Sequence, residues 1–564
     1  MTTNASFDVI VVGSGVAGLS TALFCALKGM RVLVLEQSQW IGGTSALSAG
    51  AVWIPGSQYD ESIHARNDGS ASMQTAAQYL EAATHAQSPA ALRDAFLHQG
   101  PQAIKELTTH TAVQFRAFAY HPDYCGDLPG ASTHGRALEC PPFDGRLLQE
   151  DFLRLRPPIP EFTVLNGMMV DRTDIGHLLQ MGRSWASLRY ATGLLVRYAK
   201  DRLRFTRGTR LVMGNALVAR LVYSLQQQKV PIWTNCTAKG LLTKQGDVHG
   251  LRIQKEANEI TLSATKAVVM AGGGFNDHPD WRATSLPPCV RYTPRSQTSS
   301  GALLYETLRL GARLGSNQES NACWAPVSIH TRRDQSLAVF PHFVLDRGKP
   351  GTLIVNAQGK RFANECVSYH QLGQAMLSQS EGHAWLITDR QAIQKYGLGL
   401  VRPGGRGLKK FIQAGYLIHA STLDDLAKQA GIALSHLKDS IQRYNALAST
   451  GVDEDFARGS TPYQRNLGDA SVQPNPNLRP LDDGAFFAIH LYTADIAGSR
   501  GLVTDAYGRV LRDQAPIAGL HAVGNDMHSI MGSHYPGPGI NLGPAIAFAF
   551  AASQQIYESK SKRR

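Results

Sequence analysis

The chain opens on a pattern of hydrophobic and polar positions that is typical of a parallel β-sheet. Residues 7–12 (FDVIVV) form a short, nearly continuous apolar run, as expected of a strand that is buried on both faces. Glycines follow, residues 19–28 predict a helix, and residues 31–35 (RVLVL) predict a second strand. This succession of strand, helix and strand predicts an α/β fold at the start of the chain.

The turn between these elements has the glycine spacing of a dinucleotide-binding loop. Gly13 allows a tight turn, Gly15 allows close approach of a pyrophosphate, and Gly18 allows close packing of helix and strand. The helix directs its N-terminal amides and the positive end of its dipole at the phosphates. Glu36 follows the second strand, where a carboxylate accepts hydrogen bonds from ribose hydroxyls. We therefore expect a dinucleotide here, lined by Gly13, Ser14, Gly15, Ala17, Gly18 and Glu36.

A second glycine-rich loop indicates which dinucleotide is bound. Residues 41–50 (IGGTSALSAG) lie just beyond the expected ribose carboxylate, where they suit a large flat cofactor better than a mobile nicotinamide. We therefore expect FAD, and the alternative is a simple surface loop. The expected contacts are Gly42, Gly43, Thr44, Ser45 and Gly50.

Two distant segments complete the same cofactor domain. Residues 266–274 (KAVVMAGGG) predict a strand that runs into glycines, including Gly273. Residues 520–525 predict another strand, which ends at Gly524 and Asn525. Residues 546–557 predict a helix, and we expect its N-terminus, with Asn541 and Leu542, to stabilise negative charge at the flavin O2 edge. These segments predict a Rossmann-like FAD-binding domain that is discontinuous in sequence.

At 564 residues the chain is too long for one hydrophobic core, so we expect at least two domains. The FAD-binding domain is expected to cover 1–320 and, after an interruption, 485–564. Residues 321–484 are expected to form an α+β cap, with a hairpin near 351–362 and several helices, that closes over the flavin.

Composition excludes several classes of protein. Hydrophobic residues make up 43% of the chain and charged residues 18%, which describes a globular protein and excludes a disordered one. No apolar run reaches eighteen residues, so no transmembrane helix is expected. The seven cysteines are widely spaced and form no C-x-x-C pair. We therefore expect a reduced, cytoplasmic protein without a metal site.

Charge is concentrated in an expected insertion at 148–225. The net charge of the chain is +12, and residues 183–210 contain eight Lys or Arg against one Asp, which gives +7. In the same stretch Trp185, Leu188, Ala191, Leu195 and Tyr198 recur at helical spacing. A basic amphipathic helix of this kind is typical of an interfacial anchor, so we expect peripheral contact with the inner membrane face. The alternatives are an ordinary solvated helix and, less favoured, a nucleic-acid contact; we expect no nucleic acid.

Five segments together resemble the flavoproteins related to fumarate reductase, and among these the 3-ketosteroid Δ1-dehydrogenases. The segments are Gly13-Ser-Gly15, Gly42-Gly-Thr-Ser45, Phe115-Arg-Ala-Phe118 with Pro122-Asp-Tyr124, Asn364-Glu365 with Tyr369, and Tyr535-Pro-Gly-Pro-Gly539. The last is the most specific. The resemblance covers nearly the whole chain except the insertion, and it implies an FAD-dependent 3-oxosteroid 1-dehydrogenase.

The resemblance also implies four catalytic positions. They fall on Tyr124, Tyr369, Tyr535 and the backbone amide of Gly539. In the implied reaction Tyr369 abstracts the C2 proton as a tyrosinate, Tyr124 assists it, and flavin N5 accepts the C1 hydride. Tyr535 and the Gly539 N–H then hold the ketone oxygen, where pre-aimed donors stabilise the developing enolate. About three extra residues near Tyr124 leave Tyr120 as a rival for the assisting role.

Other functions are weighed against the same segments. Fumarate reductases bind carboxylates and need arginines for this, whereas residues 535–545 contain neither Arg nor Lys. A neutral 3-ketosteroid or sterol-derived ketone therefore suits the site better. The alternatives are another cyclic ketone, the steroid Δ4 bond, or a catalytically silent flavin-binding protein docked on a membrane. The electron acceptor, a quinone or another compound, stays open.

Overall fold

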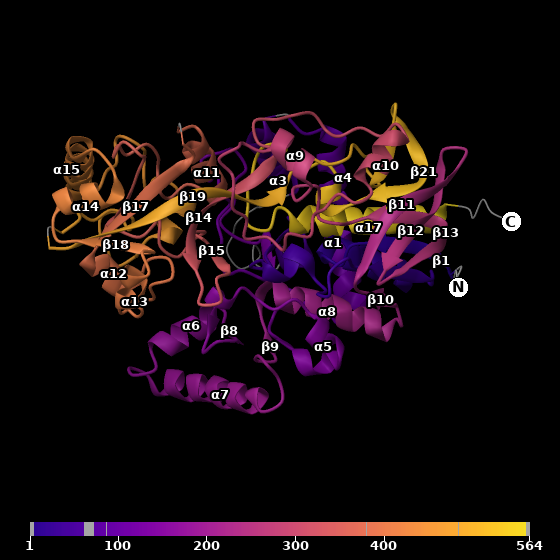
Figure 1. Ribbon diagram of the computed structural model, residues 1–564, viewed down its shortest axis with the longest axis horizontal. Coiled ribbons are helices and arrows are strands. Elements are labelled where there is room, and N and C mark those ends of the chain that lie inside the picture. Colours follow the sequence, from indigo (N-terminus) through magenta and orange to yellow (C-terminus); the bar gives the residue numbers. More distant parts are fainter. Residues whose placement is uncertain (1–4, 61–72, 86, 380, 483, 560–564) are drawn as a thin grey trace.

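The computed structural model describes residues 5–60, 73–85, 87–379, 381–482 and 484–559. Two large sheets lie at opposite ends of the molecule, one of eight strands and one of six (Figure 1). A small helical module, which contains α6 (Arg172–Leu179) and α7 (Trp185–Arg202), projects from the side between them. No helix among the described residues is both long and apolar enough to cross a lipid bilayer.

The eight-stranded sheet holds the predicted Rossmann-like unit. Five of its strands run parallel, and the apolar runs of the sequence form the buried centre of this sheet, as the pattern predicts. The parallel strands, in spatial order, are β10 (Ile232–Trp233), β2 (Val32–Leu35), β1 (Ala5–Val12), β13 (Asn258–Met270) and β21 (Ala515–Ala522). The antiparallel strands β12 (Asp247–Lys255), β11 (Cys236–Lys244) and β20 (Arg509–Arg512) extend it.

Long helices pack together around this sheet. Helix α1 (Val16–Leu27) lies between α8 (Met213–Gln227) and α17 (Leu542–Glu558), and α17 in turn packs against α4 (Ala90–His110). Helix α17 is apolar almost all round and buries most of its side chains, which explains its position inside the domain. The predicted α/β fold with an FAD-binding domain assembled from distant segments is confirmed.

The six-stranded sheet belongs to the second domain. Its strands are β15 (Leu337–Pro341), β14 (Ala322–Thr331), β19 (Phe486–Gly498), β17 (His383–Asp389), β16 (Thr352–Val355) and β18 (Leu417–Ala420). Neighbouring residues face opposite sides, so that Phe487 enters one core while Phe486 enters another. One core includes α11 (Tyr369–Leu377), α12 (Arg390–Tyr396) and α13 (Leu408–Gln413); the other includes α14 (Leu423–Ala430) and α15 (Leu434–Thr450).

The domain boundary near residue 485 differs from the expected one. Residues 486–498 form the long strand β19, which pairs with β14, β17 and β18 in the second sheet. The chain therefore returns to the first domain after residue 498. An isolated apolar strand carries no signal that identifies its sheet, because both sheets are buried on two faces.

The insertion is shorter than the expected 148–225. Strands β6 (Phe143–Asp144) and β9 (Arg210–Leu211) pair with each other and enclose the module, which also contains α5 (Asp151–Arg154), β7 (Thr163–Val164) and β8 (Met168–Met169). Helix α8, although it lies inside the expected range, packs against α1 in the main core. Its buried apolar face places it in the FAD-binding domain.

The apolar stripe expected on α7 is mostly an internal face. Ala191 and Tyr198 are buried, and Tyr198 packs with Met168 and Val170 in a small core of the module. Trp185, by contrast, is 83% exposed. The predicted apolar face of the helix is present, and part of it packs inside the module, because the module needs a core of its own and periodicity does not identify what a face packs against.

The remaining short elements connect these units. They are η1 (Gly43–Leu47), β3 (Val52–Trp53), α3 (Met73–Thr84), β4 (Arg116–Ala117), β5 (Ala137–Glu139), η2 (Gly145–Leu148), η3 (Pro160–Phe162), α9 (Pro279–Ser285), α10 (Leu304–Arg309), α16 (Pro462–Leu467) and η4 (Gly524–Asp526).

Candidate active site

The loop between β1 and α1 leaves space for a bound group at one glycine and none at two others. A Cβ atom at Gly13 would lie 2.1 Å from the Ala271 carbonyl oxygen, and one at Gly18 would lie 1.9 Å from the Gly13 carbonyl oxygen. At Gly15 the nearest atom to such a Cβ is Ser45 Oγ, at 3.5 Å. Gly15 therefore has the open approach that a pyrophosphate needs, while the other two glycines serve the turn and the packing.

The second glycine-rich loop lies against the first. Ser45 Oγ accepts a hydrogen bond of 3.1 Å from the N–H of Val16, the first residue of α1. The Gly42 N–H donates to Ser14 Oγ at 3.0 Å, and a Cβ at Gly43 would lie 3.8 Å from the Gly15 Cα atom. The two loops thus surround the N-terminus of α1 together.

Two further predicted residues lie at the edges of this loop. The Thr44 hydroxyl is 3.0 Å from Ser296 Oγ, which ties the loop to the segment after β13. Gly50 packs against the start of α8, where a Cβ would lie 2.5 Å from the Gly214 nitrogen. The role of Gly50 in this structure is therefore to let the backbone of the loop pack closely against the start of α8.

Glu36 closes the site at the end of β2. Its side chain is buried and accepts hydrogen bonds from the Ser14 hydroxyl at 2.6 Å and from the Ser38 N–H at 2.9 Å. A carboxylate held in this way retains further acceptor positions, which suit the ribose hydroxyls of a dinucleotide.

The distant segments meet the first loop at the carboxyl ends of the parallel strands. Gly524 lies on Ala17, since a Cβ at Gly524 would be 2.7 Å from the Ala17 Cβ atom. The Asn525 carbonyl oxygen lies beside Gly274, and Gly273 adopts a positive φ of 89° with Ser299 Oγ nearby. The structure therefore brings these predicted residues together, although they come from three parts of the chain.

Asp526 joins this group and was missed by the sequence analysis. Its buried carboxylate accepts hydrogen bonds from the amides of Gly272 at 2.8 Å and Gly274 at 2.6 Å, so that it holds the glycine turn after β13. Burial raises the pKa of Asp526 to about 6. The sequence marks it only as a residue next to the predicted pair Gly524 and Asn525.

The start of α17 lies next to the same site. Asn541 is the N-cap residue and its side chain caps no helix amide, but the Gly543 N–H already donates to the Gly539 carbonyl oxygen and Pro544 has no N–H. Gly524, Asn525, Ile540 and Asn541 line one common hollow. The open backbone at Gly15 and the buried carboxylate of Glu36 fit the pyrophosphate and ribose of FAD, with Gly15, Ser45 and Glu36 as the closest candidates to hold them.

Three tyrosines from distant segments form one buried cluster. The Tyr124 hydroxyl donates to the Tyr369 hydroxyl over 3.4 Å. The ring centroid of Tyr535 is 5.2 Å from that of Tyr369 and 6.0 Å from that of Tyr124. The structure thus brings together all three tyrosines that the resemblance implies.

Local structure fixes Tyr369 at the first position of α11. Ser368 caps the helix, and Ser368 and Gln371 form a reciprocal capping box. The next residue, His370, accepts a hydrogen bond from the Trp324 N–H and donates one to the Ser533 carbonyl oxygen. His370 therefore links the helix that carries Tyr369 to the loop that carries Tyr535.

Tyr124 is fixed by its backbone and by its neighbour. Its N–H donates to the Pro536 carbonyl oxygen at 2.9 Å, which joins it to the Tyr535 loop. The buried carboxylate of Asp123 pairs with Arg136 at 2.6 Å and accepts from Trp53 Nε1 at 2.8 Å. Tyr120, the rival candidate, is 41% exposed and lies against His134 outside the cluster. The geometry therefore favours Tyr124.

Gly539 has the backbone shape and the free amide that its predicted role needs. Its φ is +87°, and a Cβ would lie 2.2 Å from the Ala51 carbonyl oxygen. Its own carbonyl oxygen accepts from the N–H groups of Trp53 and Gly543, whereas its N–H has no partner among the described residues. This N–H is therefore available to an oxygen of a bound molecule.

Burial makes ionisation of the three phenols costly. Burial raises the pKa of Tyr124, Tyr369 and Tyr535 above the ordinary tyrosine range. For Tyr124, the hydrogen bond with Tyr369 and the charge of Arg347 oppose this rise in pKa. For Tyr369, the contacts with Tyr124 and Tyr535 raise the pKa further. Any role as a base thus depends on groups that favour the phenolate.

Three neighbours of the cluster were not predicted. The ring centroid of Tyr463 is 4.5 Å from that of Tyr124, and that of Phe343 is 4.8 Å from that of Tyr369. The third neighbour is Arg347, whose Nη2 lies 3.5 Å from the Tyr463 hydroxyl oxygen. No local motif distinguishes these residues, because the cap folds them toward the cluster over long sequence distances. Among the described residues no group of His, Cys, Asp and Glu is arranged to hold a metal ion.

Comparison with known proteins agrees with this geometry. Residues 8–542 match the family model of the FAD binding domain. The chain is 33% identical over 566 residues to the 4-oxocyclohex-2-ene-1-carboxylate 5-dehydrogenase of Sinomonas cyclohexanicum, covering 99% of this chain and 94% of the relative. It is 32% identical over 585 residues to the 3-oxosteroid 1-dehydrogenase of Mycolicibacterium smegmatis, covering 100% and 99%.

A solved structure is similar over the full length. It is the 3-ketosteroid Δ1-dehydrogenase of Sterolibacterium denitrificans in complex with 1,4-androstadiene-3,17-dione, with a TM-score of 0.91, 32% identity and coverage of 99% of this chain and 100% of that chain. A 3-ketosteroid Δ4-(5α)-dehydrogenase of Rhodococcus jostii, at 18% identity and a TM-score of 0.65, shares the fold.

Proposed function

The chain belongs to the family of FAD-dependent oxidoreductases that share this FAD-binding domain, and on that premise we propose that it catalyses the 1,2-desaturation of 3-ketosteroids. Full-length relatives that act as 3-oxosteroid 1-dehydrogenases support the reaction. The observation that carries the proposal is the convergence of three buried phenols from three distant segments, with one free backbone amide in the loop of the third.

The cluster has the groups that such a reaction needs. FAD, when bound, would supply the two-electron oxidant that loss of a hydride from C1 of the substrate requires. Tyr369 Oη, as a phenolate, takes the proton from C2, and the Tyr124 hydroxyl at 3.4 Å stabilises that phenolate by donating to it. Loss of the proton and the hydride leaves the C1–C2 double bond.

The ketone oxygen is assigned to Tyr535 and Gly539. A C2 proton leaves readily only if the developing enolate oxygen is stabilised, and each pre-aimed donor contributes about 3 kcal/mol to this. The Tyr535 hydroxyl and the Gly539 N–H belong to one Pro- and Gly-rich loop, whose backbone is fixed by contacts to Ala51 and Trp53. Both groups can therefore donate to one oxygen without reorganising.

A second candidate substrate is a cyclic ketone that carries a carboxylate. The Sinomonas relatives act on 4-oxocyclohexene and 4-oxocyclohexane carboxylates and are as similar to this chain as the steroid enzymes. Residues 535–545 contain neither Arg nor Lys, and the N–H groups of the nearby Arg347 are directed at carbonyl oxygens and a phenol. The absence of a free cation from this loop favours the neutral steroid.

A steady-state assay of the holoenzyme tests the proposal. A 3-ketosteroid and 4-oxocyclohexanecarboxylate are offered separately with an artificial electron acceptor, and the product is examined for a new double bond next to the carbonyl group. We expect turnover of the steroid and loss of turnover in Tyr369→Phe. Tyr120→Phe, the exposed neighbour in the segment of Tyr124, is the matched control. Turnover of the carboxylate alone would assign the second substrate class.

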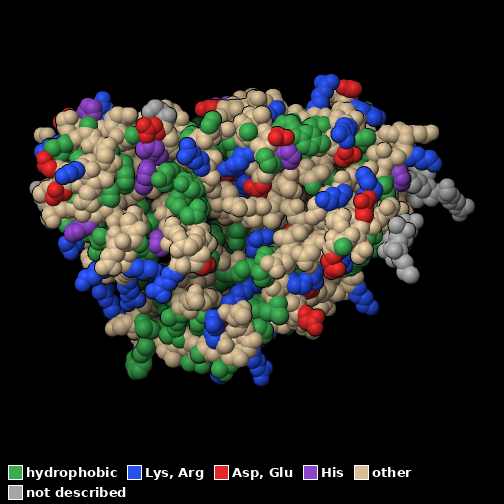
Figure 2. All heavy atoms as spheres, in the orientation of Figure 1, with side chains coloured by type: hydrophobic (Ala, Val, Ile, Leu, Met, Phe, Trp, Pro, Cys, Tyr) green, Lys and Arg blue, Asp and Glu red, His purple; other side chains and the backbone are tan. Residues whose placement is uncertain are grey.

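We further propose that the helical module docks the enzyme on the cytoplasmic face of the inner membrane. Trp185 and Leu203, at the two ends of α7, are 83% and 85% exposed. Exposed basic side chains lie between and beside them: Arg183, Arg189, Lys200, Arg202 and Arg204. Figure 2 shows green and blue side chains interleaved along the edge where Figure 1 places α6 and α7. Apolar side chains among cations suit an anionic lipid surface, where each nearby Lys or Arg adds about 1 kcal/mol.

The basic character of the module is smaller than the sequence suggests. Arg210 pairs with Asp174, Arg197 lies 3.3 Å from Asp144, and Arg207 donates to carbonyl oxygens inside the module. The five exposed basic residues therefore carry the proposed attraction to lipid. An apolar steroid dissolves in the same lipid, which places substrate and enzyme together.

Vesicle binding tests this docking. The holoenzyme is sedimented with vesicles of anionic phospholipid, and we expect the double variant Trp185→Ser/Leu203→Ser to bind at least about tenfold more weakly because two apolar side chains are lost. Tyr557→Ser, an exposed aromatic residue on α17, is the control and should bind normally. Equal binding of all three proteins would exclude the proposed surface.

A further inference from the structure

Arg347 is a fully buried arginine whose guanidinium group is bonded to the shell of the tyrosine cluster. Nε donates to the carbonyl oxygens of His342 and Phe343, both at 3.0 Å. Nη1 donates to the carbonyl oxygens of Glu365 and Val367. Nη2 lies 3.5 Å from the Tyr463 hydroxyl oxygen. The side chain is therefore held from several directions without access to water.

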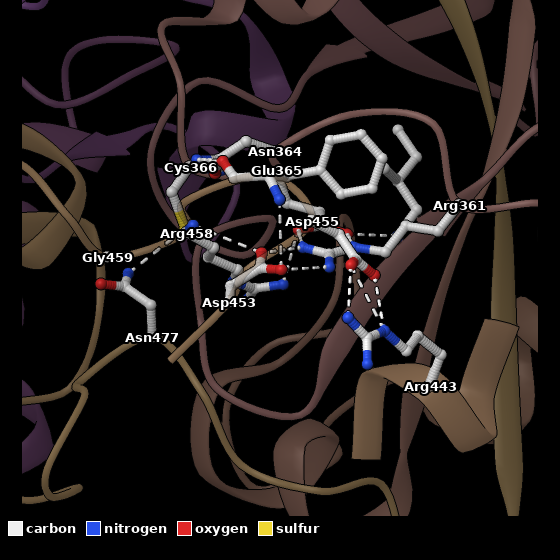
Figure 3. A network of polar contacts seen from close by, with 12 residues as sticks. Arg361, Asn364, Glu365, Cys366, Arg443, Asp453, Asp455, Arg458, Gly459 and Asn477 are labelled. Carbon is white, nitrogen blue, oxygen red and sulfur yellow. Dashed lines mark hydrogen bonds and ion pairs between the residues drawn. The ribbon is translucent and has the colours of Figure 1, made fainter. Parts of the chain in front are cut away.

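The positive charge of Arg347 has no ion-pair partner among the described residues. Arg347 donates to the carbonyl oxygen of Glu365, but the carboxylate of Glu365 forms its ion pairs with Arg361 and Arg458 (Figure 3). Arg361 also pairs with Asp453, so this network is neutral by itself, with two cations and two anions. Arg347 is bonded to the backbone beside the network and adds an uncompensated charge.

The adjacent carboxylate of Asp346 is also directed elsewhere. It lies 2.7 Å from His342 Nδ1 and accepts hydrogen bonds from the Gly399 N–H and from the main-chain N–H of Arg347. A buried arginine that is bonded only to carbonyl and phenol oxygens is costly to retain, since nothing cancels its charge. A role of this charge in the neighbouring tyrosine cluster would explain why a buried arginine is present at this position.

The groups that hold Arg347 are in contact with the two tyrosines that form the base. The Phe343 ring packs edge-on to Tyr369, and Val367 lies two residues before it. The Tyr463 ring packs against Tyr124 with centroids 4.5 Å apart. Because a guanidinium group only donates, the Tyr463 oxygen accepts from it, and the hydroxyl proton of Tyr463 points away from Arg347. The phenol dipole thus extends the positive potential from Arg347 outward.

The other titratable groups that face the cluster are neutral near pH 7. Burial lowers the pKa of His121, beside Tyr124, and of His370, beside Tyr535, to about 4. Burial raises the pKa of the thiols of Cys125 and Cys323 to about 12 and also raises that of Cys366. Tyr535 and Tyr463 are protonated phenols whose pKa is raised by burial. Two buried carboxylates also lie near the cluster: Asp123 pairs with Arg136, and Asp346 lies 2.7 Å from His342 Nδ1. Arg347 is the buried cation here that has no ion-pair partner among the described residues.

We propose that Arg347, acting with Tyr463, is a positioning residue that holds a fixed positive charge behind the Tyr124–Tyr369 pair and favours its deprotonated form. The cation touches neither tyrosine and acts through the Tyr463 ring and through the segment 365–367 that leads to Tyr369. The charge of Arg347 lowers the pKa of Tyr124 and of Tyr463. Its catalytic consequence rests on the proposed function, whereas its effect on phenol ionisation does not.

Ionisation of Tyr369 in the holoenzyme is the direct test. The ultraviolet absorbance of phenolate is followed against pH, and subtraction of the same titration of Tyr369→Phe isolates the contribution of Tyr369. We expect Arg347→Met to raise the midpoint by about one pH unit or more, because a neighbouring opposite charge shifts a pKa by that amount. Arg347→Lys keeps the charge and should keep the midpoint. Tyr463→Phe removes the relaying hydroxyl and should raise the midpoint by less.

A matched control separates charge from packing. Arg220 on α8 also donates to carbonyl oxygens, those of Ala112, Pro141 and Pro142, but lies in the other domain. Arg220→Met should leave the Tyr369 midpoint unchanged. An unchanged midpoint in Arg347→Met would overturn the proposal. If that variant does not fold, an unchanged midpoint in Tyr463→Phe would overturn it instead.

Activity gives a second readout that keeps the two proposals apart. If the chain desaturates 3-ketosteroids, the ascending limb of its kcat against pH should move to higher pH in Arg347→Met and stay in place in Arg347→Lys. A purely structural role would lower kcat equally at every pH. A chain that turns over no steroid but shows the shift in phenol titration would contradict the proposed function and retain the role of Arg347.

Discussion

The hydroxyl of Tyr124 donates to the hydroxyl of Tyr369 across 3.4 Å, although the two residues are 245 positions apart in the chain. Tyr124 comes from the FAD-binding domain and Tyr369 from the first turn of a helix in the second domain. The pair therefore lies at the contact between the two domains. The proposed base therefore couples the chemistry to the fold of the whole chain.

Loss of the Tyr369 hydroxyl should abolish most of the activity. Tyr369→Phe keeps the ring and its contacts with Phe343 and Tyr535 but removes the proton acceptor, so we expect kcat to fall by at least about a hundredfold. Tyr124→Phe should cost less, because it removes only the assisting donor. Steady-state kinetics with constant FAD content measures both. A Tyr369→Phe enzyme with normal kcat would exclude this residue as the base.

Gly539→Ala should damage the site through its backbone. The added Cβ would lie 2.2 Å from the Ala51 carbonyl oxygen at a φ of +87°, so the loop must shift and its free N–H moves with it. We expect kcat to fall by about a hundredfold or more, as for loss of one pre-aimed donor. Gly431→Ala is the control, since Gly431 has a φ of +68° with no atom within 4 Å of the added Cβ. It should lower stability by about 1 kcal/mol and leave kcat unchanged.

Local and long-range features of the chain differ in how well the sequence predicts them. Gly13, Gly15, Gly18 and Glu36 lie within one strand–helix–strand unit, and their spacing alone determines their positions. Arg347 and Asp526 were missed because their surroundings depend on segments brought together by the whole fold. The resemblance supplied Tyr124 and Tyr369, whose meeting no local pattern predicts.

The same distinction explains the errors outside the site. The helical period of α7 correctly identified an apolar face, but the partner of that face, the core around Met168, is a tertiary feature. Residues 486–498 form a long strand, but strand pairing, which the sequence does not show, decides which sheet they join. Periodicity predicts which elements form and which faces are buried, and it leaves their partners undetermined.

Glu36→Gln should weaken FAD binding. The buried carboxylate accepts hydrogen bonds from Ser14 and Ser38, and a neutral amide offers one acceptor oxygen in place of two charged ones. Hydrogen bonds to charged groups contribute about 1.5–3 kcal/mol, so we expect the Kd for FAD to rise at least about tenfold. Titration of the apoprotein with FAD, followed by flavin fluorescence, measures this. Glu259→Gln, an exposed acid on β13, should bind FAD normally.

Asp526→Asn should remove a pH-dependent cost from the stability of the apoprotein. Burial raises the pKa of Asp526 to about 6, above the ordinary value near 3.8, so the folded chain retains a proton that the unfolded chain releases. This carboxyl group therefore costs stability as the pH rises from about 4 through 6, by up to about 3 kcal/mol. Asparagine cannot ionise, but it has one acceptor oxygen, whereas the amides of Gly272 and Gly274 bond to different oxygens of the carboxylate, so one of these amides loses its partner.

Denaturant unfolding at pH 5 and pH 8 measures this difference. The gain of Asp526→Asn over the unmodified chain should be larger at the higher pH, where the carboxylate is charged. Asp247→Asn, at the exposed start of β12, should change the free energy of unfolding little, and by the same amount at pH 5 and pH 8. A gain that does not depend on pH would show that ionisation of Asp526 is not its source.

Asp123→Asn should test how far the fold around Tyr124 depends on one buried ion pair. The carboxylate pairs with Arg136 at 2.6 Å, and both side chains are buried, so the amide would leave a buried cation without its anion. Removing one partner of such a pair costs about 3–5 kcal/mol, whereas Asp513→Asn, in an exposed pair with Arg313, should cost less than about 1 kcal/mol. Because Asp123 directly precedes Tyr124, we also expect kcat to fall with little change in FAD affinity. A variant with normal stability and normal kcat would show that the backbone bond from Tyr124 to Pro536 is sufficient to hold the base pair in place.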